Sequence, residues 1–113
     1  MTRIEEYLSY LDHYTKEYGS QTIVLYQCGK FFEIYGIQNE EENVGCVYQI
    51  GELLNFQVTR ADKSIPTNSR KNPLLCGFPL SSIDNVIPIL LRHQYTVVLV
   101  EQVTPPPHPT RKV

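Results

Sequence analysis

Residues 22–35 constrain the fold of this chain most strongly. Residues 22–28 are rich in β-branched and aliphatic side chains, a composition typical of a strand that is buried on both faces. Gly29 interrupts this run, and residues 30–35 then predict a second strand. The second strand either pairs with the first through a very short connection or continues it after a bend.

Side chains in the second predicted strand alternate between its two faces with a period of two. Phe31 and Glu33 therefore share one face, whereas Phe32 and Ile34 share the other. An exposed phenyl ring can stack on a nucleobase while a neighbouring carboxylate binds the edge of that base. The alternative is a hairpin strand whose aromatic side chains are all buried in the core. Local sequence leaves both interpretations open.

Helical periodicity predicts two helices in the N-terminal half. Thr2 and Glu5 form a capping-box pattern at the start of the first helix, which runs to Gly19. Asn39 is the expected cap of the second helix, because the three glutamates that follow it suit the positive end of a helix dipole. Apolar residues between 44 and 54 supply the packing face of that helix.

Three further strands follow from alternation and β-branched residues. They lie at residues 56–59, 74–78 and 95–100, with a polar, basic and turn-rich loop at residues 60–72. The strand at 95–100 is continuously apolar, so we expect it at the centre of the sheet.

A third helix completes the predicted order of elements. Ser81 or Ser82 caps this helix, and Pro88 should kink it unless that face is exposed. The order indicates an α/β fold with a mixed β-sheet of about five to six strands, flanked by three helices. Such an architecture alone names no function.

The length of 113 residues fits one domain. We expect this domain at residues 1–104, and we interpret residues 105–113 as a proline-rich exit that begins a linker to a second domain. The sequence has no run of eighteen apolar residues, and its N-terminus is polar. We therefore expect neither a membrane span nor a signal peptide, and an intracellular protein.

Cysteine and histidine patterns predict neither disulfides nor a metal site. The three cysteines are odd in number, widely spaced and set in apolar surroundings, which favours reduced and mostly buried thiols: Cys28, Cys46 and Cys76. The three histidines lie far apart and form no ligand spacing: His13, His93 and His108.

Charge is distributed unevenly along the chain. The formal net charge is −2, but residues 1–59 carry −6 and residues 60–113 carry +4. This asymmetry permits a local phosphate-binding surface, although solvated basic loops explain it equally well. A chain with this net charge should bind DNA only weakly by itself.

Four segments, taken together and in order, resemble the N-terminal mismatch-recognition domain of MutS-type DNA repair proteins. They are residues 25–35, 75–79, 98–103 and 111–113. The most specific element is the glycine, phenylalanine, aromatic and glutamate pattern that begins at Gly29. Two further stretches resemble a branch of the family found in large DNA viruses: residues 68–73 and 103–107.

The resemblance implies that Phe31 intercalates at a mispair from the minor groove of kinked DNA, and that Glu33 hydrogen-bonds the edge of the base. The chain departs from the family pattern at Lys30, where the family commonly has an acid. This lysine could contact a phosphate. Further supporting DNA contacts are expected at Cys28, Arg60, Lys63, Arg70, Lys71, Arg111 and Lys112.

The resemblance also implies partners. These are double-stranded DNA with mispairs or small loops and the remaining MutS domains, which carry the ATP and magnesium chemistry and the dimer contacts of the parent protein. This domain itself is expected to have no catalytic residue and no cofactor, and to be a monomer when isolated. The chain has no phosphate-binding GxxxxGK[ST] loop. The genome served could lie in the cytoplasm, a viral factory or an organelle.

Two other functions remain as alternatives. A small magnesium-dependent α/β nuclease would need acids at strand ends, and the candidates are Glu33, Asp84 and Glu101. A protein-interaction domain would use the proline tail and the tyrosines of the first helix, which are Tyr7, Tyr14 and Tyr18.

Overall fold

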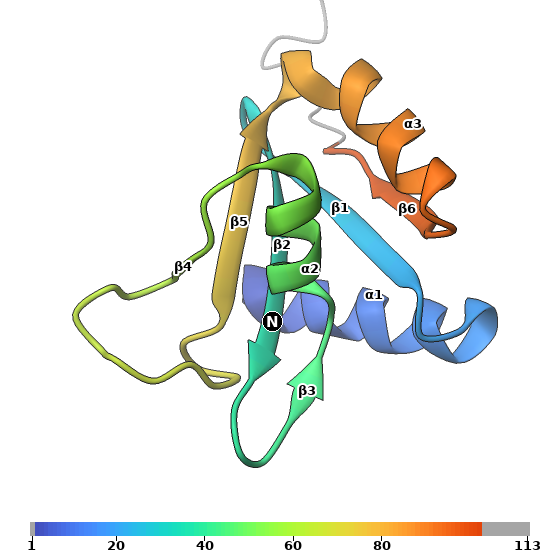
Figure 1. The fold of residues 1–113 in the computed structure, drawn as a ribbon. Coiled ribbons are helices and arrows are strands. Elements are labelled where there is room, and N and C mark those ends of the chain that lie inside the picture. Colours follow the sequence, from blue (N-terminus) through green and yellow to red (C-terminus); the bar gives the residue numbers. More distant parts are fainter. Residues whose placement is uncertain (1, 103–113) are drawn as a thin grey trace, which may run out of the picture.

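A mixed sheet lies between helices in the computed structural model, which describes residues 2–102 (Figure 1). In that part of the chain the helices are α1 (Arg3–Tyr18), α2 (Val47–Leu54) and α3 (Ile83–Arg92), with a short 3₁₀ helix, η1 (Leu80–Ser82). The strands are β1 (Thr22–Cys28), β2 (Phe31–Gln38), β3 (Asn43–Val44), β4 (Thr59–Arg60), β5 (Leu74–Pro79) and β6 (Thr96–Val100). The predicted α/β fold with three helices is confirmed.

Strand β2 is the centre of the sheet. The strand order is β4-β5-β2-β1-β6, and β3 pairs with the far end of β2. Strands β1 and β2 form an antiparallel hairpin, β2 also pairs antiparallel with β5, and β1 pairs parallel with β6. The two strands predicted at residues 22–35 therefore lie side by side, and the second does not continue the first.

The two faces of the sheet are covered by different helices. Helix α1 covers one face, where the ring of Tyr7 packs edge-on against that of Tyr35 with centroids 5.2 Å apart. Helix α2 covers the other face, and α3 packs near β6 at the same side (Figure 1). There Phe32 and Phe78 are buried with ring centroids 5.8 Å apart. Odd-numbered residues of β2 consequently face α1.

The first helix begins as the sequence predicts. The Thr2 hydroxyl accepts a hydrogen bond from the Glu5 amide at 3.1 Å, and the Glu5 carboxylate accepts one from the Thr2 amide at 2.8 Å. This reciprocal capping box satisfies two amides that a helix start leaves unpaired. It also fixes the position of Arg3, the first residue of α1.

The prediction of a helix beginning at Asn39 is wrong. Asn39 instead opens the turn between β2 and β3, and its side-chain oxygen accepts hydrogen bonds from the amides of Glu41 and Glu42, both at 2.8 Å. Asparagine satisfies neighbouring amides in the same way at a turn and at a helix start, so the local pattern fits both. Helix α2 begins only at Val47.

Three strand predictions are also corrected. Strand β2 runs through Gly36 to Gln38 and does not end at residue 35, and the strand expected at residues 56–59 is only Thr59–Arg60. Strand β6 has the predicted position in the sequence but lies at the edge of the sheet, with β1 as its strand neighbour. Its side chains are accordingly half-buried, apart from Leu99, which is exposed.

Pro88 lies inside α3 with its side chain exposed to solvent. This is the condition under which the sequence allowed a proline in the helix. The buried residues of α3 are Val86 and Leu90, on another face of the helix. Pro88 therefore leaves the packing face of α3 in place.

Gly36→Ala should destabilise the fold. A Cβ atom at this position would lie 2.6 Å from the carbonyl oxygen of Val44 and 2.7 Å from Cγ2 of Val47. Overpacking of this kind costs about 1–3 kcal/mol of unfolding free energy, which urea denaturation of the 113-residue chain measures.

The matched control is Gly77→Ala on the neighbouring strand β5. Its Cβ would approach other atoms no closer than 3.5 Å, at the carbonyl oxygen of Phe32. We expect this variant to change the unfolding free energy by about 0.5 kcal/mol or less. Equal effects of the two alanines would contradict the close packing at Gly36.

Candidate nucleic-acid interface

A tight turn joins β1 to β2. Cys28 pairs with Phe31 in the antiparallel register, so the turn consists of only Gly29 and Lys30. Gly29 has a φ of 60°, as the first position of a type II′ hairpin turn requires, and glycine adopts this value without strain. The turn therefore presents Lys30 and Phe31 at the tip of a two-stranded hairpin.

Phe31 is exposed at this tip. Half of its surface, 50%, is accessible to solvent, whereas its neighbour Phe32 is only 4% exposed. Helix α1 covers β2 as far as Glu33, and Phe31 lies two residues, about 7 Å, further along the strand. The strand partner of Phe31 on β5 is Pro79, which is also exposed. The alternative in which every aromatic of this strand is buried is therefore wrong.

Glu33 lies on the same face as Phe31 and is held by two other side chains. The Tyr35 hydroxyl donates a hydrogen bond to Glu33 Oε1. Arg3 Nε donates to the Tyr35 oxygen at 3.1 Å and lies 3.7 Å from Glu33 Oε1. Burial, and next the bond to Glu33, raises the pKa of Tyr35, so its hydroxyl stays protonated. Only 21% of the Glu33 side chain is exposed.

One flank of Glu33 is left open by a glycine. Gly77 of β5 is the strand partner of Glu33 and is exposed. A Cβ at this glycine would lie 3.8 Å from Glu33 Cγ, so any larger side chain there would cover the carboxylate. On the other flank, Tyr26 of β1 is tied by its hydroxyl to the Glu6 carboxylate of α1. The β5 neighbour of Glu33 therefore places no side chain over the carboxylate.

Two glutamines fasten the turn to the end of β6. The Gly29 amide donates to Gln102 Oε1 at 3.0 Å, and the Gln102 amide donates to Gln27 Oε1 at 2.9 Å. Gln27 Nε2 in turn donates to the Gly29 carbonyl at 3.2 Å. We call these three hydrogen bonds the glutamine clamp. The clamp holds the backbone next to Phe31 in one conformation.

Cys28 lies beside this site as an unreactive thiol. Burial, and next the nearby Glu33 carboxylate, raises the pKa of Cys28 from its ordinary value of 9.0 to about 11. The thiolate is the nucleophilic form, so a raised pKa argues against covalent chemistry here. Cys46 and Cys76 are also free thiols, but the prediction of mostly buried thiols is wrong, because Cys28 and Cys46 are half-buried and only Cys76 is buried.

The predicted basic contacts are not gathered around Phe31. Lys30 is exposed in the turn beside it. Four other predicted contacts lie on β4 or in the loop between β4 and β5: Arg60, Lys63, Arg70 and Lys71. Asn68 of this loop is hydrogen-bonded to Gln38, at the end of β2 opposite Phe31. That end of β2 is about 23 Å from Phe31 along the strand. Arg111 and Lys112 lie outside the described residues.

Two of these arginines already have partners within the fold. Arg60 donates from Nε to the carbonyl of Ile65 at 2.7 Å and from Nη2 to that of Lys63 at 3.1 Å, so it braces the loop. Arg70 forms an ion pair with Glu42 at 2.8 Å. These side chains are less available to phosphates than the sequence suggests, whereas Lys63 and Lys71 are exposed.

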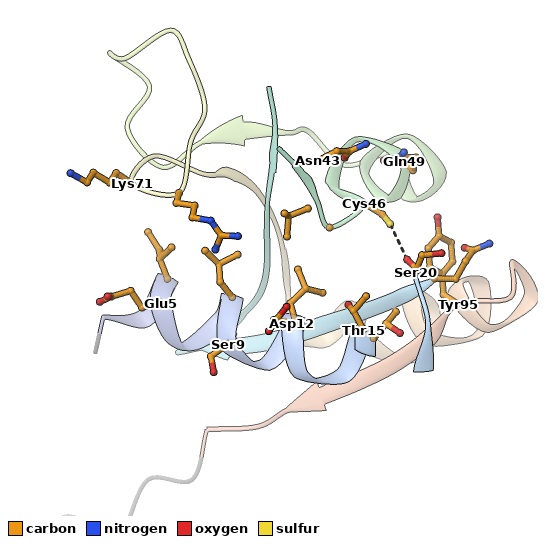
Figure 2. Close-up of a pocket in the computed structure, with 18 of the residues that line it drawn as sticks. Glu5, Ser9, Asp12, Thr15, Ser20, Asn43, Cys46, Gln49, Lys71 and Tyr95 are labelled. Carbon is orange, nitrogen blue, oxygen red and sulfur yellow. Dashed lines mark hydrogen bonds between the residues drawn. The ribbon is translucent and has the colours of Figure 1, made fainter. Parts of the chain in front are cut away.

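Surface hollows border the described part of the fold, and two of them lie beside α1. Figure 2 shows the larger, of about 1340 Å³, between α1 and the segment that contains β3 and the start of α2. Of the predicted contact residues, only Arg70 and Lys71 are among its lining residues. The smaller hollow, of about 730 Å³, lies beside the hairpin and is lined by residues that include Arg3 and Cys28.

Within residues 2–102 no three or more histidine, cysteine, aspartate and glutamate side chains converge on a possible metal position. The nuclease acids Glu33, Asp84 and Glu101 therefore form no such group. Nor does the described part of the chain contain a helix that is both long and apolar enough to cross a membrane.

Sequence reasoning missed Arg3, Tyr35 and the role of Gln102. Arg3 and Glu33 are thirty residues apart, and no spacing rule connects the first turn of a helix to a strand side chain. The sequence around Tyr35 does not indicate that its hydroxyl contacts Glu33. Gln102 lies in one of the segments that carry the family resemblance, but nothing in the sequence indicates that it binds the turn at Gly29.

Comparison with known proteins gives consistent matches. The family described as MutS domain I matches residues 9–112. A mutS homolog of DNA mismatch repair from Acanthamoeba polyphaga mimivirus is 33% identical over 97 residues, which is 85% of this chain and 8% of the relative. The DNA mismatch repair protein MutS of Thermodesulfovibrio yellowstonii is 32% identical over 91 residues, 80% of this chain and 9% of the relative. The chain thus spans less than a tenth of each relative's length.

Loss of one hydrogen bond of the glutamine clamp should increase the opening of the turn at Gly29. Gln102→Ala deletes the acceptor of the Gly29 amide, and a hydrogen bond of this kind contributes about 0.5–1.5 kcal/mol. Hydrogen exchange at the Gly29 amide should therefore accelerate roughly 2- to 10-fold. Gln57→Ala, at an exposed glutamine between α2 and β4, is the matched control and should leave this amide unchanged. An unchanged rate in Gln102→Ala would refute the clamp.

The raised pKa of Cys28 predicts slow alkylation. At pH 8 its thiolate fraction should be about 100-fold lower than that of a thiol with a pKa of 9, because each pKa unit is a factor of ten. Site-resolved mass spectrometry after iodoacetamide treatment measures the rate as a function of pH. The rate should keep rising up to about pH 11 in the folded chain. In the urea-unfolded chain it should level off lower, and identical profiles would contradict the prediction.

Proposed function

The chain belongs to the MutS domain I family, and we propose that it is a module that recognises mispaired or unpaired bases in double-stranded DNA. The observation that supports this proposal most directly is the exposed Phe31 ring beside the Glu33 carboxylate at the tip of a fastened hairpin. A single exposed apolar side chain is common on protein surfaces, so the support comes from the combination of an exposed ring, a carboxylate on the same face and a hydrogen-bonded turn.

In this proposal Phe31 is a wedge. Its ring enters the minor groove and stacks on one base of the mispair while the duplex kinks, as other apolar wedges do with bends of roughly 20–90°. Mispaired and unpaired bases cost less to unstack than paired ones, so deformability provides the discrimination. A fixed turn serves this role, because a wedge on a loose loop would lose conformational entropy on insertion.

Glu33 reads the edge of the displaced base. A carboxylate near DNA phosphates is electrostatically unfavourable, so it has to gain a specific hydrogen bond to be tolerated. In the minor groove an intact A·T pair presents only acceptors, so the carboxylate also disfavours binding to such a duplex. Lys30 at the turn supplies a phosphate contact next to the wedge.

The other basic residues have a lesser role in the proposal. Lys63 and Lys71 are about one strand length from Phe31, so any phosphate that they contact lies several base pairs away from the mispair. Cys28 lies next to the site, and its neutral thiol adds no charge there. Arg60 and Arg70 would have to exchange their present partners for phosphates.

We further propose that this module works inside a larger protein. In that protein residues 1–104 form the recognition domain and residues 105–113 begin the connection to further MutS domains, which supply ATP hydrolysis with magnesium and dimerisation. The length of the relatives supports this view, because the chain matches only 8% and 9% of them. The recognition module itself contributes binding and no catalysis.

A protein-interaction surface is the second candidate. The rings of Tyr10, Tyr14 and Tyr18 stack along α1 with centroids 6.5 Å and 6.0 Å apart, and Tyr18 is 54% exposed. Tyr7 does not belong to this surface, because it is fully buried and donates to the carbonyl of Val24 at 2.8 Å. Acidic side chains on α1 repel DNA phosphates, so a protein is a more suitable partner than DNA for the stacked tyrosines of α1.

The wedge assignment predicts the effect of Phe31→Ala. Stacking of a ring on a base contributes about 1–3 kcal/mol, so the preference for a duplex with one mispair over a matched duplex should fall roughly 5- to 150-fold. Fluorescence anisotropy with both duplexes measures the ratio, using the protein with whatever sequence follows Val113 in its gene.

The matched control removes another exposed apolar side chain. Leu91→Ala on α3 deletes a side chain that is 54% exposed, and it should leave the ratio unchanged. If Phe31→Ala keeps the wild-type ratio, Phe31 is not the wedge. If the wild-type protein binds both duplexes equally, the proposed function itself is wrong.

A further inference from the structure

Helix α1 carries a row of three stacked tyrosine rings. Tyr10, Tyr14 and Tyr18 follow one another at intervals of four residues, so each ring lies next to the following one along the helix. Their centroids are 6.5 Å and 6.0 Å apart, and the planes of successive rings differ by only 12° and 5°. His13 packs edge-on against Tyr14 with centroids 4.8 Å apart. We call the three stacked rings the tyrosine ladder.

The tyrosine ladder lies mostly outside the buried core. The buried residues of α1 are Tyr7, Leu8 and Leu11. Among the described residues only Tyr10 of the ladder packs against the core, and Tyr18 is 54% exposed. The ladder therefore has aromatic surface that the fold itself does not cover, and such surface can pack against a ligand.

The described chain ends beside the first ring of the ladder. The hollow of about 730 Å³ is lined both by Gln102, the last described residue, and by Tyr10. Tyr26 belongs to the same lining, and its ring centroid is 6.4 Å from that of Tyr10. The glutamine clamp holds Gln102 at this place. The segment that follows Gln102 therefore begins next to the ladder.

That segment has the composition of a polyproline ligand. It lies outside the described residues, but its sequence places four prolines and one histidine at positions 105–109. Proline-rich segments favour the polyproline II conformation, which binds to grooves lined by aromatic rings. Two residues in this conformation span about 6 Å, which is close to the ring spacings of 6.5 Å and 6.0 Å in the ladder.

The lengths of the ladder and of the proline segment also agree. Tyr10 and Tyr18 are eight residues apart in α1, which is about 12 Å along the helix axis. Residues 105–109 span about 15 Å in the polyproline II conformation. The prolines could therefore run from Tyr10 to Tyr18, which would bring residues 111 and 112 to the last turn of α1.

The charges of the two partners are complementary. Helix α1 has four acidic and two basic side chains, a net charge of −2 with histidine neutral. Residues 103–113 contain Arg111, Lys112 and no acid, a net charge of +2. Glu17 lies three residues from Tyr14 and next to Tyr18, with His13 Nε2 3.8 Å from its Oε2. A carboxylate is therefore present where the basic end of the segment would arrive.

We propose that the tyrosine ladder is the docking surface for residues 104–109 of this same chain, with Arg111 and Lys112 next to Glu17. The proline rings pack on the tyrosine rings, and the segment runs along α1 away from Phe31. A weak contact is sufficient because the ligand is tethered. At an effective concentration of about 1 mM, a contact with a Kd of about 0.1 mM docks about nine-tenths of the segment. The inference does not depend on DNA binding.

NMR of the 113-residue chain detects this contact directly. We expect nuclear Overhauser effects between proline side-chain protons of residues 105–109 and the ring protons of Tyr10 and Tyr14. The same proline protons should show upfield ring-current shifts. A mixture of isotope-labelled and unlabelled chains separates contacts within one chain from contacts between two copies.

Variants on both sides of the contact test its specificity. Tyr14→Ala removes the middle ring, and it should lower the ratio of docked to free segment about fivefold or more, with loss of most of the proline shift. The double variant Pro106→Ser and Pro107→Ser changes only the segment, so it leaves the fold intact and should have the same effect on the shifts of Pro105 and Pro109. Tyr48→Ala, at a tyrosine of α2 that is 46% exposed, is the matched control.

The inference is supported if both ladder and proline variants remove the shifts and Tyr48→Ala keeps them. It is overturned if the wild-type chain shows no contact between the prolines and the ladder, or if Tyr48→Ala removes the shifts as well. Contacts that arise only between labelled and unlabelled chains also overturn it, because the occupant is then a second copy. Each of these results leaves the role of Phe31 in DNA binding unaffected.

Discussion

The antiparallel register between β1 and β2 determines everything that this domain presents to a ligand. Because Cys28 lies opposite Phe31, the odd-numbered side chains of β2 face α1 and the even-numbered ones face α2. A slip of one residue would exchange the two faces, burying Phe31 and exposing Phe32. The two-residue turn and the pairing of β2 with β5 on its other side fix this register, so the core and the binding tip are specified together.

The fold could be predicted where one local pattern allows only one structure. The capping box at Thr2 specifies the start of α1, and two β-rich runs around a glycine predict two strands, although only the structure shows that the second strand pairs with the first. The segment after Asn39 could not be predicted, because the same side-chain bonds serve a turn and a helix. The position of β6 at the edge of the sheet could not be predicted either, because a continuously apolar sequence does not determine how many strands pair with it.

The candidate site divides in the same way. Alternation predicts that Phe31 and Glu33 share a face, and the structure adds that α1 ends its cover just before Phe31. The contacts of Arg3 with Tyr35 and Glu33 depend on how a helix lies across a strand, and sequence spacing contains no measure of that. A count of charges does not show that Arg70 forms an ion pair with Glu42, or that Arg60 donates to the carbonyl of Ile65.

The glutamine clamp has a mechanical consequence. It joins Gln102, the second residue after β6, to the turn beside Phe31, by way of two glutamine side chains and without passing through the core. A displacement of the backbone at Gln102 would therefore act on Gly29 through these hydrogen bonds, by a path that avoids the buried side chains. The position of the backbone at Gln102 and the conformation of the β1–β2 turn are therefore coupled by one short set of hydrogen bonds.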